Sequence, residues 1–136
     1  MNLRNLFKRK ARNEDKVIEA DPNKMPEPKD LAGFMQRGWA YHSRGNYEKA
    51  EVDFRRGVSL DPESIDAYFV LGLVYKAQER RDEAVKSFKK SLKLLETGKL
   101  DDRARTEMLR RLSLGHINEL EKGDWDLETE VWRRGT

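Results

Sequence analysis

The sequence predicts an all-α fold in which antiparallel helical hairpins stack with a right-handed sense into a solenoid. Three observations predict it. Six positions recur at one fixed spacing, apolar residues follow a helical period, and no segment alternates apolar and polar residues as a half-buried strand would. The recurring pairs are Phe34/Tyr68, Gly38/Gly72, Tyr41/Tyr75, Ala50/Ala84, Phe54/Phe88 and Leu60/Leu94. Such a 34-residue offset is typical of arrays whose units bury their apolar faces against neighbouring copies.

Residues 1–29 precede the first expected helix and are interpreted as a tail or linker, because they carry three prolines between positions 22 and 28. Positions 1–13 hold five basic side chains and no acid. Beside them, Leu3, Leu6 and Phe7 would form a short amphipathic element able to touch an anionic membrane surface. The alternatives are a tail that moves freely or rests on the domain, and a transit peptide, although this segment lacks serine.

The repeat domain is expected over residues 30–136, and its first repeat over residues 31–64. Asp30 is suited to cap a helix that runs to about residue 44. Gly45-Asn46 then turns the chain into a second helix at 47–60.

The second repeat is expected over residues 65–98. Asp61-Pro62 supplies a cap followed by a first-turn proline, and the helix that follows should reach about residue 79. Asp82 is expected to cap the fourth helix, and Gly98 to follow its end.

Gly38 and Gly72 lie inside expected helices, where glycine costs about 1 kcal/mol relative to alanine. A close crossing between the two helices of each hairpin would compensate this cost, because small residues let the axes approach. Ala50 and Ala84 offer the small facing surface. The residues expected to fill the space beside the two crossings are Tyr41, Phe54, Tyr75 and Phe88.

Residues 100–134 are interpreted as a degenerate third hairpin that closes the open end of the stack. Asp101 or Asp102 is suited to cap a long helix reaching about residue 121, and Gly123-Asp124-Trp125 repeats the chemistry of the first turn. The helix is expected to bury Ala104, Met108, Leu109, Leu112, Gly115 and Leu120.

Both repeats resemble the tetratricopeptide repeat, whose pattern is W-x2-L-G-x2-Y, then A-x3-F, then P. The first copy carries Phe34, Arg37, Gly38 and Tyr41, then Ala50, Phe54 and Pro62; the second carries Tyr68, Leu71, Gly72 and Tyr75, then Ala84 and Phe88. The departures are the aromatic residue that replaces Trp, Arg37 in place of Leu, and Glu96 where the second proline would fall.

The resemblance implies an inner surface lined by the first helix of each hairpin, at the second, fifth, ninth, twelfth and thirteenth positions of the repeat. The residues expected to bind a partner there are Met35, Trp39, His42, Ser43, Asp66, Phe69, Leu73 and Lys76. The four apolar residues among them form a stripe, which in a soluble protein marks an interaction site: Met35, Trp39, Phe69 and Leu73. The alternative is that the tail, the last helix or a second copy of the chain buries the stripe. Family members that clamp a terminal carboxylate use Lys and Asn where this chain has Met35 and Trp39, which argues against that activity.

Composition argues against catalysis and cofactor chemistry. The chain has no cysteine and only two histidines, and neither histidine has a nucleophile or a cluster of metal ligands around it. We therefore expect a non-enzymatic module with no cofactor and no metal. No apolar leader or long uninterrupted apolar run appears, which leaves the cytoplasm as the expected location.

Positive charge concentrates on and just before the fourth expected helix, at Arg80, Arg81, Lys86, Lys89, Lys90 and Lys93. Such a stripe attracts phosphates, but the net charge is only +3, acids are interspersed, and no aromatic stacking platform accompanies the stripe in the sequence. The preferred interpretation is a scaffold or adaptor that binds a protein or peptide. The alternative is membrane or nucleic-acid association through the basic segments, with the repeats as a structural or self-associating unit. Oligomeric state stays open.

Overall fold

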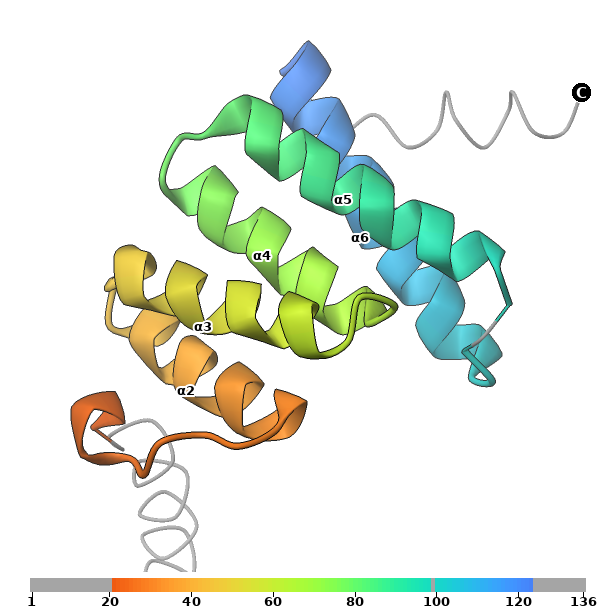
Figure 1. Cartoon of the computed structure of the whole chain (residues 1–136). Coiled ribbons are helices and arrows are strands. Elements are labelled where there is room, and N and C mark those ends of the chain that lie inside the picture. The colour runs from red at the N-terminus through yellow and green to blue at the C-terminus, as the bar shows by residue number, and fades with distance from the viewer. Residues whose placement is uncertain (1–20, 99, 124–136) are drawn as a thin grey trace, which may run out of the picture.

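The computed structural model describes residues 21–98 and 100–123, and over these residues it contains five α-helices, one 3-10 turn and no strand. The elements are η1 (Pro22–Lys24), α2 (Leu31–Ser43), α3 (Tyr47–Leu60), α4 (Ile65–Ala77), α5 (Arg81–Glu96) and α6 (Arg103–Lys122). Each helix packs against the next one along the chain, so the molecule is an all-α stack of antiparallel helices (Figure 1). The predicted fold class is confirmed.

The two repeats keep the same register. Helices α2 and α4 are equally long and start at equivalent positions of the repeat, Leu31 and Ile65. Asp30 caps α2 by accepting a hydrogen bond from the Gly33 backbone nitrogen at 2.8 Å, as predicted. Ser64 caps α4 in the same way, through Ala67 N at 3.2 Å, so the prediction that Asp61 caps this helix and Pro62 lies in its first turn is wrong.

The prediction that Asp82 caps α5 is wrong. The helix begins at Arg81 and its N-cap residue is Arg80, which makes no capping side-chain bond. In the second repeat Arg80 takes the place of Asn46, whose side chain caps α3. The repeat therefore fixes where the helix starts, even though arginine has no acceptor to offer. Glu79 likewise takes φ 60° at the place where the first hairpin has Gly45 at φ 76°.

Phenylalanine rings explain the two helical glycines. A Cβ atom on Gly38 would lie 2.5 Å from Cε1 of Phe54, and one on Gly72 would lie 2.7 Å from Cε1 of Phe88. Both rings are fully buried. The closest approach to each glycine is thus made by an aromatic ring that was expected beside the crossing.

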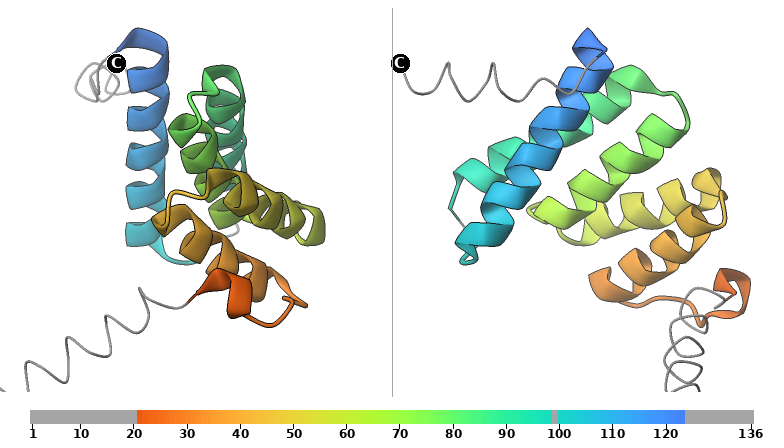
Figure 2. Two further views of the ribbon diagram at one scale, coloured as in Figure 1. Left: turned by 90° about the vertical axis from the view of Figure 1, so that its left-hand side faces the viewer. Right: turned by 180° about the vertical axis from the view of Figure 1, so that it is seen from behind.

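Helix α6 runs back along α5 and covers the far side of the second hairpin (Figures 1 and 2). Leu109 joins Ile65, Leu94 and Leu95 in one apolar cluster, whereas Ile117 joins the main core of α2 to α5. Asp102 caps the helix, as one of the two predicted candidates. The predicted burial of Ala104 and Met108 is wrong, since both are exposed. The buried positions on α6 are Leu109, Ser113, Gly115, Ile117 and Asn118.

Residues 21–30 pack against the first hairpin on the side away from α4 (Figure 1). Pro22 is buried, and Asn23 Oδ1 accepts hydrogen bonds from the Tyr41 hydroxyl and from Lys49 Nζ, both at 3.1 Å. This part of the expected tail or linker therefore rests on the repeat domain. Residues 1–13, the candidate membrane element, and the second helix of the degenerate hairpin lie outside the described residues.

Candidate partner-binding surfaces

The inner surface of the first repeat is open. Trp39 is 42% exposed on α2, and its ring contacts His42 edge-on at 5.4 Å and Phe54 at 5.9 Å between centroids. Met35 lies half-buried one turn earlier. The Ser43 hydroxyl donates to the Trp39 carbonyl oxygen at 2.7 Å, so it is already used within the helix. The first repeat thus presents one large aromatic surface with a polar margin.

The inner surface of the second repeat is largely occupied by α6. Lys76 Nζ lies 2.6 Å from Glu119 Oε2 and 3.0 Å from His116 Nδ1, and Asp66 pairs with Arg105. The His116 ring also stacks on Phe88, with 4.9 Å between centroids and 9° between planes.

Phe69 and Leu73, both half-buried, also pack against the core. Of the eight predicted binding residues, Trp39 and Ser43 are exposed and Met35 and His42 are half-buried on the first repeat, whereas Asp66, Phe69 and Lys76 contact α6.

Both histidines that lie at the inner surface are held neutral near pH 7. Burial lowers the pKa of His42 below its usual value. Burial, followed by the charge of Lys76, lowers the pKa of His116 to about 4. His116 Nδ1 can therefore accept a hydrogen bond from the Lys76 ammonium group. Among the described residues, no group of three His, Asp or Glu side chains is placed to hold a metal ion.

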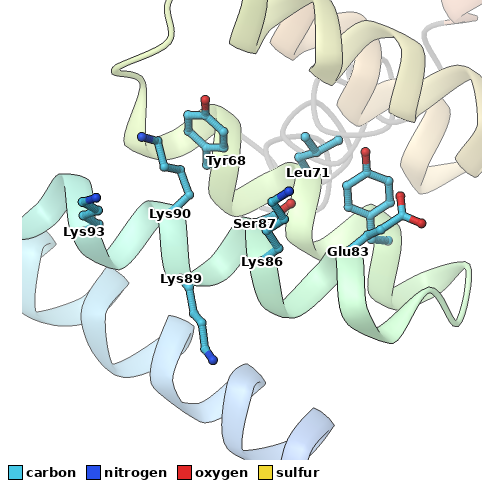
Figure 3. Close-up of a pocket in the computed structure, with 9 residues that line it drawn as sticks. Tyr68, Leu71, Glu83, Lys86, Ser87, Lys89, Lys90 and Lys93 are labelled. Carbon is cyan, nitrogen blue, oxygen red and sulfur yellow. The ribbon is translucent and has the colours of Figure 1, made fainter.

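Apart from the inner surface, a hollow lies between α4 and α5 and has a volume of about 600 Å³. It is called the lysine cleft here. Its wall on α4 is formed by Tyr68, Leu71 and Tyr75; its wall on α5 is formed by Glu83, Lys86, Ser87, Lys89, Lys90 and Lys93. Figure 3 shows tyrosines of α4 and lysines of α5 around the same space, with Lys89 pointing away toward α6. The basic stripe of the sequence thus forms one side of a concave site.

The sequence interpretation missed the tyrosines beside this stripe, because they come from the preceding helix. Their ring faces already carry cations: Lys90 Nζ lies 5.8 Å from the Tyr68 centroid, and Arg80 Cζ lies 4.6 Å from that of Tyr75. The repeat offset is the signal that could have found Tyr75. It gives Tyr75 the same place beside the second helix of its hairpin as Tyr41 has in the first hairpin.

Comparisons with known proteins agree with the repeat architecture. Residues 38–79 match a family model described as TPR repeat, and residues 65–94 match one described as Tetratricopeptide repeat. Over 76 residues the chain is 32% identical to the type IV pilus assembly protein PilF of Pseudomonas aeruginosa. That match covers 54% of this chain and only 30% of PilF. No helix among the described residues is long and apolar enough to cross a membrane.

Proposed function

We propose that this chain, which belongs to the tetratricopeptide repeat family, is a non-enzymatic adaptor that binds an apolar segment of a partner protein at the inner surface of its first repeat. Tetratricopeptide repeats generally mediate binding between proteins. The similarity to a pilus assembly protein supports a role in assembling other proteins. We propose the cytoplasm as the location of the chain.

The exposed Trp39 ring is the observation that carries the proposal. Tryptophan is enriched among the residues that dominate binding energy at protein interfaces. Trp39 is held in place by edge-on contacts with His42 and Phe54, so little side-chain entropy remains to be lost on binding. The half-buried Met35 extends the apolar surface along α2, and His42 adds a neutral polar group at its margin.

The inner surface of the second repeat supports the same site indirectly. Because α6 contacts Asp66, Phe69 and Lys76, the partner is expected to reach Leu73 at most and to bind chiefly along α2. Ser43 is expected to act toward a partner only as a hydrogen-bond acceptor, since its hydroxyl proton is donated to the Trp39 carbonyl oxygen.

Affinity capture with the purified full chain tests this function. Trp39→Ala should lose a defined set of proteins from a lysate of the source cells, and His42→Ala should weaken their retention. Val52→Ala is the matched control, because Val52 is 60% exposed on α3, away from this surface. Circular dichroism should show all three variants folded. An identical set of captured proteins with Trp39→Ala would reject the site.

A further inference from the structure

The first hairpin shows how a proline-containing segment of the same chain binds a surface of this type. Residues 21–30 lie on it with Asn23 bonded to Tyr41 and Lys49, and with Glu27 Oε2 accepting from Arg37 at 2.9 Å. Asp21 lies 3.9 Å from Arg44. This segment, which carries three prolines, three acids and two lysines, is therefore held by one tyrosine and three cations.

The repeat offset relates this occupied surface to the lysine cleft. Tyr41 corresponds to Tyr75 and Arg37 to Leu71, and both counterparts line the cleft. The first aromatic residue also carries a cation in both repeats: Arg56 Cζ lies 5.7 Å from the Phe34 centroid, much as Lys90 Nζ lies over Tyr68. The two surfaces are thus built from equivalent positions of the two repeats, but only the surface of the first repeat is covered by residues 21–30.

The lysine cleft also carries more unbalanced positive charge than its counterpart. Asp53, which neutralises Arg37 in the first repeat, is replaced by Ser87. Lys86 and Lys93 stand where the first repeat has Val52 and Ser59. Lys86, Lys90 and Lys93 are exposed and make no ion pair with any described residue, whereas Lys89 pairs with Glu121 at 3.1 Å.

We propose that the lysine cleft is a second binding site, which takes an extended segment rich in Asp and Glu from a partner protein. Lys86, Lys90 and Lys93 follow one another at helical intervals of four and then three positions, so they lie along one face of α5, where carboxylates of an extended acidic stretch can meet their ammonium groups. Leu71 and Tyr75 form an apolar floor for the backbone of that segment.

A protein segment is favoured over single-stranded nucleic acid by the state of the tyrosines. Bases bind such proteins by stacking on open aromatic faces. In this cleft Lys90 lies over Tyr68 and Arg80 over Tyr75, so the rings contribute edges and hydroxyl groups rather than free faces. Carboxylates meet ammonium groups without any need for stacking.

The test uses the full chain and a fluorescein-labelled peptide of four Glu-Pro pairs, followed by fluorescence anisotropy at low salt. The peptide should bind, added salt should weaken it, and the same peptide with Gln for Glu should not bind. K86Q/K90Q/K93Q should lower the affinity at least about tenfold, because it removes three charge-assisted contacts. K24Q/R103Q/R111Q removes the same three charges from elsewhere and should change the affinity less than about twofold.

Three outcomes would overturn the proposal: no binding of the peptide to the full chain, an equal loss of affinity in both triple variants, or tighter binding of an eight-nucleotide thymidine strand through the same lysines. Trp39→Ala should leave peptide binding unchanged. The proposal for the lysine cleft and the proposal for the inner surface can therefore be refuted independently of each other. Amide shifts in nuclear magnetic resonance spectra should fall on residues 68–75 and 83–93, and shifts centred on α2 would also contradict the assignment.

Discussion

Replacing Arg37 with leucine should destabilise the protein strongly, although leucine is the residue that the family pattern has at this position. Arg37 donates from Nε to Asp53 Oδ2 at 2.9 Å and from Nη2 to Asp53 Oδ1 at 2.7 Å. The Asp53 side chain is only 2% exposed. Removing one partner of such a pair leaves an uncompensated buried charge, which costs about 3–5 kcal/mol. We expect about 3 kcal/mol for Arg37→Leu, because the new side chain recovers some apolar contact.

The second repeat indicates the compensating change, because it has Leu71 and Ser87 at the corresponding positions. Arg37→Leu with Asp53→Ser should therefore lie within about 1 kcal/mol of the unchanged protein, since replacing both members of a buried pair is often neutral. Urea unfolding followed by circular dichroism measures both free energies, and the melting temperature of the single variant should fall by roughly 12 °C or more. A single variant that loses less than about 1 kcal/mol, or a double variant as unstable as the single, would refute this reasoning.

Three further predictions concern stability. Gly72→Ala should lower the melting temperature, with a cost of about 1–3 kcal/mol, because the new Cβ atom would displace the buried ring of Phe88 and outweigh the better helix propensity of alanine. His116 has its pKa lowered to about 4, so the unfolded chain, with a histidine pKa of about 6.5, binds its proton first; stability should be complete above pH 6.5, fall as the pH drops toward 4, and fall less in His116→Gln. Arg105→Ala should change the free energy of unfolding by less than about 1 kcal/mol, because its ion pair with Asp66 is exposed on both sides.

Each of these predictions has a contrary result. A Gly72→Ala variant that melts at or above the temperature of the unchanged protein would show that the Phe88 ring has room to move. The pH prediction fails if the unchanged protein and His116→Gln lose stability in parallel as the pH drops from the unfolded histidine pKa to the folded one. A loss of several kcal/mol in Arg105→Ala would mean that the arginine holds α6 in place.

Most of the fold could be predicted from the repeat in the sequence, because each copy fixes the same turns and the same helix crossings. Helix α5 follows α3 at the repeat offset even where the local signals differ, because Glu79 and Arg80 precede α5 where Gly45 and Asn46 precede α3. Asp82 was a plausible cap by residue type alone, but the register of the repeat starts α5 at Arg81, directly after Arg80.

The features that sequence patterns missed all depend on contacts between helices. Arg37 was noted only as a departure from the family pattern, because its partner Asp53 lies on the next helix. On α6, helical periodicity did not reveal which face meets α5. Burial was therefore predicted for Met108, which is in fact exposed. The inner surface on α2 stays a prediction, and the contact of α6 with Lys76 could not be predicted because it joins residues far apart in the sequence.

The packing of residues 21–30 against α2 has a consequence for larger assemblies. These residues shield the flank of the first hairpin that a preceding repeat would otherwise use for stacking, and they do so through polar bonds to Tyr41, Lys49 and Arg37. Another protomer or repeat protein that approaches this flank end-on must first displace residues 21–30 and break those bonds. Head-to-tail polymerisation of the solenoid is therefore obstructed at this flank.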